Sequence, residues 1–174
     1  MKTTTIITSL LMTFAIVACN HTTKELSHDE LINAIDSIET PLMNNIMLEG
    51  MDSTQGMQIY ALYIQFADSY PSDSLTPCYL HSAAKVATSM GLIDNMLECY
   101  DRVINNYPNY EKMDECFYEK ALALDNAGRK NEARLAYQEF LDEYPEHFLA
   151  EDFRKALRLL DMSDELLLDF LSGK

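Results

Sequence analysis

The chain has 174 residues, of which 48% are hydrophobic and 24% are charged, and its formal net charge is −15. This composition is typical of a globular protein and not of a disordered one. So acidic a chain repels phosphate groups, which disfavours nucleic-acid partners and electrostatic docking on anionic lipids and favours a basic or neutral protein partner.

The first 18 residues predict a cleaved export signal. A lysine precedes an apolar run over 6–17, which is too short to span a bilayer as a helix. The run ends in Ile-Val-Ala-Cys at 16–19, which resembles the lipobox of bacterial lipoproteins. In that family the cysteine receives diacylglycerol and usually a further acyl chain, such as palmitate, on the new amino group. The resemblance implies a signal peptide over 1–18, a lipid anchor at Cys19 and a tether over 19–26. An ordinary secretory signal with a chance cysteine is the alternative.

The residues that follow Cys19 bear on the location of the protein. An aspartate directly after the cysteine, which resembles an inner-membrane retention signal, is absent. An acidic cluster that resembles the surface-export signals of the Bacteroidota is also absent, apart from Lys24-Glu25. We therefore expect an outer-membrane lipoprotein of the cell envelope that faces the periplasm, and the surface-exposed side stays open.

The first helices are predicted from local signals, within an expected helical domain over 27–174. Residues 27–30 have the Ser-x-x-Glu pattern of a capping box, which predicts a helix over 27–39. A threonine–proline pair then predicts the N-cap and first position of a second, shorter helix over 40–48. Two glycines predict a turn region over 50–56.

A repeat of 37 residues organises the rest of the chain. Three tyrosine–proline pairs recur at this interval, at 70–71, 107–108 and 144–145, and a second tyrosine series keeps the same step, at 63, 100 and 137. Full units over 72–108 and 109–145 each predict a helix, a glycine turn at Gly91 or Gly128, a second helix and the tyrosine–proline end. Residues 54–71 match the second half of a unit. A fixed period of this length predicts a stacked helical repeat with almost no strand.

These units resemble the tetratricopeptide repeat (TPR). In 109–145, Ala121 and Ala133 are the two small residues of that pattern, and Tyr137 and Pro145 are its aromatic residue and its proline. In 72–108 the corresponding residues are Ala84, Met96, Tyr100 and Pro108, and Met96 departs from the small-residue preference. The resemblance covers about 41–171 and implies an all-α TPR-type superhelix of stacked helical hairpins. The lengthened unit resembles periplasmic TPR lipoproteins of the BamD and CpoB/YbgF type.

The tail over 146–171 predicts a last pair of helices. Its first helix has an apolar face, and a serine at 163 predicts the start of a final short helix. We expect this pair to cap the stack, and binding of a partner is the alternative.

No catalytic motif is present: the chain has no phosphate-binding glycine loop, no Gly-x-Ser-x-Gly and no His-Glu-x-x-His. We therefore expect a protein that is not an enzyme and has no cofactor. No Cys-x-x-Cys and no cysteine–histidine cluster at metal spacing occurs, so we expect no metal site. Cys78, Cys99 and Cys116 are predicted to be apolar packing residues, and one disulfide among them stays open.

The repeat register also predicts which tyrosine, histidine and acidic side chains are buried and which are exposed. Tyr63, Tyr100 and Tyr137 are predicted to be buried between helices. His81 is expected to be a surface histidine, solvated or hydrogen-bonded, with a ligand or acid–base role as the alternative. The acidic residues of the second unit are expected to form a solvated helix face: Asp114, Glu115, Glu119 and Asp125. Tyr79, Tyr110 and Tyr118 lie off the repeat register, and local packing is favoured over contact with a partner or a sugar.

The TPR resemblance implies that the first helix of each unit lines a groove for a protein partner. It nominates eight residues: Cys78, His81, Lys85, Thr88, Glu115, Tyr118, Leu122 and Asp125. The Lys/Asn/Arg set by which chaperone-type TPRs grip a terminal carboxylate is not reproduced, because only Lys85 could serve. The implied function is a membrane-anchored adaptor that docks an envelope protein, in outer-membrane protein assembly or in envelope or division coordination. The alternative is a lipoprotein of the outer membrane that binds a glycan or a peptide ligand.

Overall fold

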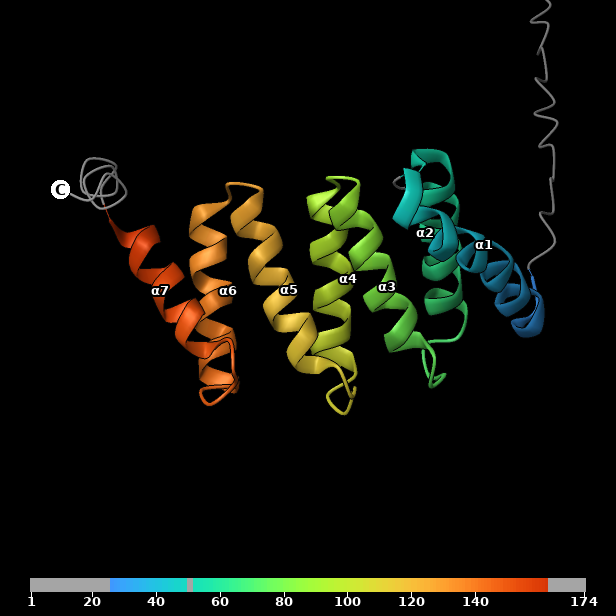
Figure 1. The fold of residues 1–174 in the computed structure, drawn as a ribbon. Helices are drawn as coiled ribbons and strands as arrows, with labels where there is room; N and C mark the ends of the chain where they lie inside the picture. The colour runs from blue at the N-terminus through green and yellow to red at the C-terminus, as the bar shows by residue number, and fades with distance from the viewer. Residues whose placement is uncertain (1–25, 50–51, 163–174) are drawn as a thin grey trace, which may run out of the picture.

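The computed structural model describes residues 26–49 and 52–162, and this part of the chain forms seven helices and no strand. The helices are α1 (His28–Glu49), α2 (Ser53–Ser69), α3 (Thr76–Ser89), α4 (Ile93–Asn106), α5 (Met113–Asn126), α6 (Lys130–Glu143) and α7 (Ala150–Asp161). They lie side by side in one row, each packed against the next along the chain (Figure 1). The all-α prediction is confirmed. The predicted signal, Cys19 and the helix after residue 162 lie outside the described residues.

The turns inside the hairpins have the backbone that the glycines predict. Gly91 has a φ of +70°, and Gly128 has a φ of +72°. Around Gly91, the Leu92 N–H donates to the carbonyl of Ala87 at 2.9 Å and the Gly91 N–H donates to that of Thr88 at 3.0 Å. The same two bonds surround Gly128. Both α3 and α5 therefore end in a left-handed glycine motif that satisfies their last carbonyl groups.

The tyrosine–proline pairs mark the joints between hairpins. Tyr70, Tyr107 and Tyr144 close α2, α4 and α6 with φ values of −130°, −128° and −129° and ψ values of 59°, 60° and 56°. Each tyrosine N–H donates back to the carbonyl four residues earlier. The proline that follows has no N–H and cannot continue the helix. The three joints therefore share one backbone conformation.

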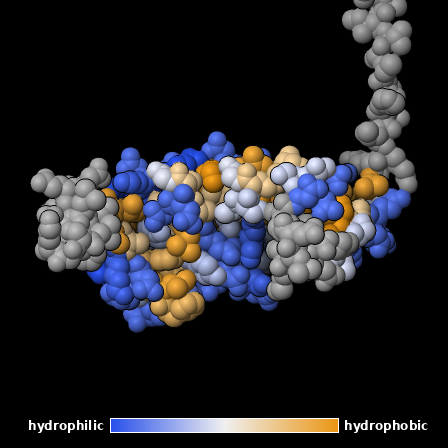
Figure 2. Space-filling model, turned by 45° about the horizontal axis from the view of Figure 1, so that its top comes forward, coloured by the Kyte–Doolittle hydropathy of each residue, from blue (hydrophilic) through white to orange (hydrophobic). Residues whose placement is uncertain are grey.

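The core runs without a break along the stack. Tyr63, Tyr100 and Tyr137 are 3%, 1% and 1% exposed, as the repeat predicts. Met96 is fully buried, so a flexible thioether fills the position that Ala133 takes in the next unit. None of the described helices is both long and apolar enough to cross a membrane. The face displayed in Figure 2 is largely hydrophilic, with hydrophobic patches between the polar residues.

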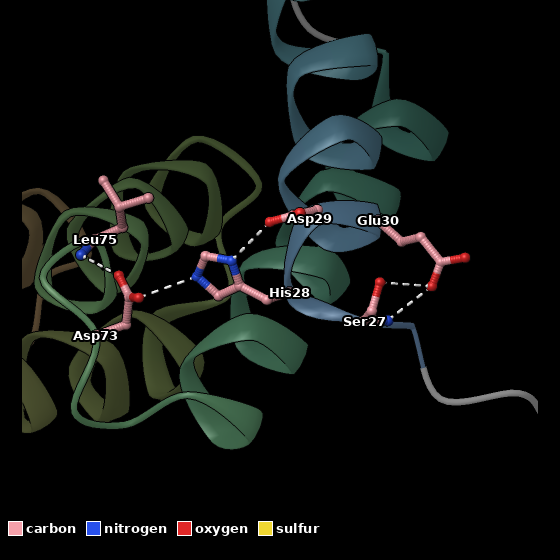
Figure 3. A network of polar contacts seen from close by, with 6 residues as sticks. All are labelled: Ser27, His28, Asp29, Glu30, Asp73 and Leu75. Atoms are coloured by element: carbon pink, nitrogen blue, oxygen red, sulfur yellow. Dashed lines mark hydrogen bonds and ion pairs between the residues drawn. The ribbon is translucent and has the colours of Figure 1, made fainter.

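The first helix starts as predicted. The Glu30 carboxylate accepts hydrogen bonds from the Ser27 backbone N–H at 2.9 Å and from its hydroxyl at 2.8 Å. These bonds appear at the start of α1 in Figure 3. They satisfy the Ser27 N–H at the start of the helix, so the bond from the N-cap N–H to Glu30, one half of the predicted capping box, is confirmed.

Two other boundaries at this end of the chain were predicted wrongly. The helix α1 continues through Thr40 and Pro41, so the second helix expected over 40–48 is part of α1. A proline inside a helix removes one backbone hydrogen bond, and the packing of α1 against α2 compensates for this local loss. Gly56 lies buried inside α2 instead of in a turn. The α2 N-cap is Asp52, whose carboxylate accepts from the Thr54 N–H at 3.0 Å.

Candidate functional site

A hollow of about 270 Å³ lies between α3 and α5. Its lining includes three of the predicted groove residues, Lys85, Thr88 and Leu122, which occupy adjacent turns of the two helices. Leu122 is 40% exposed. The remaining lining residues are Tyr100, Glu119, Ala123 and Asn126. The lining of the hollow thus combines apolar side chains with two charged groups, Lys85 and Glu119.

Glu119 is the centre of a polar network beside this hollow. One carboxylate oxygen accepts from His81 Nε2 at 2.7 Å and from the Tyr100 hydroxyl at 3.0 Å, and the other lies 3.3 Å from Lys85 Nζ. Burial opposes the ionisation of Glu119, but the hydrogen bonds and the positive charge outweigh it and lower the pKa of this carboxyl. Glu119 was expected on a solvated face, and the network shows that this expectation was wrong.

His81 is 3% exposed, so the surface position expected for it was also wrong. Tyr110, from the turn before α5, packs edge-on against the imidazole, and its hydroxyl lies 3.1 Å from His81 Nδ1. Because Nε2 faces a carboxylate that only accepts, the neutral ring donates from Nε2 and accepts at Nδ1 from the tyrosine hydroxyl. The sequence pointed to a hydrogen-bonded histidine but did not identify either partner.

Glu115 lies one turn before Glu119 on the same face of α5. The possible ligand atoms of His81, Glu115 and Glu119 all lie within 4.8 Å of one another. Within the described part of the chain, Glu115 makes no hydrogen bond or ion pair. The structure therefore brings together two nominated residues, His81 and Glu115, with one residue, Glu119, that was not nominated.

The other nominated residues lie elsewhere. Tyr118 is half-buried and packs with the rings of Phe140 and His147, at centroid distances of 6.4 Å and 6.1 Å. Asp125 accepts a hydrogen bond from the Tyr137 hydroxyl at 2.8 Å. Cys78 is exposed and lines a different hollow. These three residues do not line the hollow between α3 and α5.

The hollow that contains Cys78 measures about 810 Å³ and lies between the turn after α2 and the turn after α4. Tyr107 and Tyr110 both line it. The Tyr107 hydroxyl donates to the carbonyl of Pro71 at 2.8 Å and links the two turns. Its remaining lining is mainly polar and exposed.

The three described cysteines are free thiols. Cys99 and Cys116 are buried, as the sequence predicts, whereas Cys78 is exposed and departs from that prediction. Burial raises the pKa of Cys99 to about 11 and the pKa of Cys116 to about 12, so both thiols stay protonated at neutral pH.

Comparison with protein families finds that residues 115–147 match the tetratricopeptide repeat. The match covers α5, the glycine turn, α6 and the joint that follows, which together form one hairpin. A search of curated proteins found no match to the chain. Together with the seven helices in a row, the match identifies the fold as an all-α stack of the TPR type.

Proposed function

We propose that this chain is a membrane-anchored, non-enzymatic adaptor that binds a protein of the cell envelope in the hollow between α3 and α5. The observation that carries the proposal is Leu122, which is 40% exposed in a hollow flanked by Lys85 and Glu119. An apolar side chain with a polar rim is a typical anchor point of a protein interface. Stacked helical repeats present such faces to their partners.

Charge selects the partner. The hollow is lined by one carboxylate, Glu119, and one ammonium group, Lys85. A second carboxylate, Glu115, lies close to Glu119, one turn earlier on α5. The whole chain has a net charge of −15. A basic partner is therefore steered toward this face, a neutral partner is not repelled, and an acidic partner is repelled.

The proposed cellular location of the protein is based on its N-terminal sequence. A signal over 1–18 and an acylated Cys19 would hold the stack at the outer membrane, on the periplasmic side. There an adaptor could serve outer-membrane protein assembly or the coordination of the envelope with division. Replacing Cys19 by Ala is expected to abolish fatty-acid labelling and membrane retention. Unchanged labelling would contradict the anchor.

Site-specific photocrosslinking tests the docking surface. A photoreactive residue at Leu122 is expected to capture a protein partner in cells. The matched control is Leu135, which is 64% exposed and lies near Lys120 and Glu139 between α4 and α6, away from the hollow. Equal capture from both positions, or capture from Leu135 alone, would contradict docking between α3 and α5.

A glycan-binding function is the second candidate, favoured by the larger hollow between the two turns. Tyr107 and Tyr110 line it together with exposed polar residues, and aromatic rings with polar neighbours suit a sugar. Binding of a soluble oligosaccharide that is lost in Tyr107→Ala, with crosslinking from Leu122 absent, would favour this function over the adaptor.

A further inference from the structure

We propose that His81, Glu115 and Glu119 form a binding site for a divalent metal ion of the zinc class. The three possible ligand atoms lie within 4.8 Å of one another, so small side-chain movements bring all of them onto one ion. Imidazole nitrogen and carboxylate oxygen are both zinc ligands, and three protein ligands leave a fourth position for water. This site goes beyond the adaptor function and does not depend on it.

The repeat itself shows that packing does not require these three residues. One unit later, 37 residues on, the positions of His81, Glu115 and Glu119 are occupied by Tyr118, Asp152 and Ala156. Tyr118 packs between rings there, and Ala156 is half-buried. Burial of an imidazole and a carboxylate costs solvation free energy that tyrosine and alanine do not cost. His81, Glu115 and Glu119 are therefore specific to the surface between α3 and α5, and the fold does not require them.

The neighbours of the trio suit a metal site. In metal centres the second ring nitrogen of a ligating histidine is usually held by a hydrogen bond, and ligating carboxylates are held in the same way. Here the Tyr110 hydroxyl holds His81 Nδ1, and the Tyr100 hydroxyl holds Glu119. When an ion binds Nε2, the ring takes the Nδ1–H tautomer and donates to the oxygen of Tyr110, so the tyrosine changes from donor to acceptor.

One cationic side chain, that of Lys85, competes with the ion for Glu119. Lys85 Nζ lies 3.3 Å from Glu119, but its side chain is 55% exposed and can move into solvent when a metal binds. The ion also displaces the hydrogen bond between His81 and Glu119. Imidazole favours zinc over calcium and magnesium.

Calorimetric titration of the full-length chain, purified in detergent and stripped of metal, tests the site with Zn²⁺ and with Ca²⁺. One Zn²⁺ per chain is expected, with much weaker binding of Ca²⁺. Glu115→Gln and His81→Tyr are each expected to weaken Zn²⁺ binding by at least about 10-fold. Loss of a residue that only supports a metal ligand already weakens binding by about this factor, and loss of a ligand itself should weaken it at least as much. Lys85→Gln is expected to tighten it, because a competing cation is removed.

Asp152→Asn is the matched control, since Asp152 takes the place of Glu115 one unit later and has an exposed side chain. Its Zn²⁺ affinity is expected to equal that of the unaltered chain. Absence of Zn²⁺ binding at about 1 mM, undiminished binding in Glu115→Gln, or equal binding of Ca²⁺ would each overturn the proposal. If His81→Tyr does not fold, Glu115→Gln still decides, because Glu115 makes no hydrogen bond in the described part of the chain.

Discussion

The imidazole of His81 lies 3.1 Å from the hydroxyl of Tyr110, across the boundary between two hairpins. One unit later the same two positions carry Tyr118 and His147, whose rings lie 6.1 Å apart. The histidine and the tyrosine have thus exchanged places between neighbouring units. In both units, one histidine and one tyrosine therefore connect the first helix of the unit to the turn that follows its second helix.

This exchange predicts coupling between His81 and Tyr110. His81→Tyr and Tyr110→His alone are each expected to destabilise the fold, because each leaves two like rings at the joint. The double variant has the same arrangement as Tyr118 and His147. Its loss of unfolding free energy is expected to be smaller than the sum of the two single losses, with an interaction free energy of about 0.5–3 kcal/mol. Urea unfolding of the four proteins measures it. Additive losses would show that the two residues act independently.

A pH dependence is expected where α1 meets the turn before α3. His28 Nδ1 lies 3.2 Å from Asp29 and Nε2 lies 3.0 Å from Asp73, so both ring nitrogens face carboxylates (Figure 3). Carboxylates only accept, so both contacts are hydrogen bonds only when the ring carries a proton on each nitrogen. The hydrogen bonds that the imidazolium donates to Asp29 and Asp73 accordingly raise the pKa of His28 above its usual 6.5. The backbone N–H of Leu75, together with His28, lowers the pKa of Asp73 below 3.8.

The signs of these two shifts define a pH window. The raised pKa of His28 stabilises the fold fully below pH 6.5, and this contribution is lost as the pH rises through the raised value. The lowered pKa of Asp73 stabilises the fold above pH 3.8, and this contribution is lost as the pH falls through the lowered value. Urea midpoints of the unaltered chain are expected to fall between about pH 6 and 8, and His28→Gln is expected to flatten that fall. An equal fall in both proteins would exclude His28 as its source.

Substitution of either turn glycine, Gly91 or Gly128, is expected to lower the free energy of unfolding through backbone strain alone. A Cβ added at Gly91 or Gly128 meets nothing within 4 Å, but both residues have a positive φ. Gly91→Ala and Gly128→Ala are therefore each expected to lose about 1 kcal/mol of unfolding free energy. Asparagine tolerates this conformation better, so Gly91→Asn is expected to lose less. Thermal and urea unfolding provide the comparison, and equal stabilities of the Ala and Asn variants would contradict the strain argument.

The buried repeat tyrosines predict unequal effects of removing a hydroxyl. Tyr100 donates to Glu119, which keeps His81 and Lys85 as partners when the hydroxyl is removed. Tyr137 donates to Asp125, whose side chain makes no other hydrogen bond within the described residues. Tyr100→Phe is expected to cost about 1 kcal/mol and Tyr137→Phe about 2 kcal/mol. A larger loss for Tyr100→Phe in urea unfolding would reverse the argument.

The repeat could be predicted because its joints restrict residue type. A positive φ favours glycine at Gly91, and a missing N–H marks the proline after each joint tyrosine, so both constraints are visible in the sequence. The long α1 could not be predicted in the same way. Pro41 signals a helix start locally, and only the packing of α1 on α2 explains why the helix continues.

The site was predictable only in part for a similar reason. Lys85, Thr88 and Leu122 follow from the TPR resemblance, which implies that the first helix of each unit lines the groove. The network at Glu119 depends on side chains from three helices and one turn, which no spacing along the chain expresses. Comparison of His81 with Tyr118 at the repeat interval was the one available signal that this wall differs from the next.

The shared backbone conformation of Tyr70, Tyr107 and Tyr144 makes the protein modular. Each of the three joints ends its helix with the same tyrosine backbone conformation, so neighbouring hairpins are connected in the same local way. A gene that gained or lost one 37-residue module would change the reach of the protein and leave the shape of every remaining joint as it was.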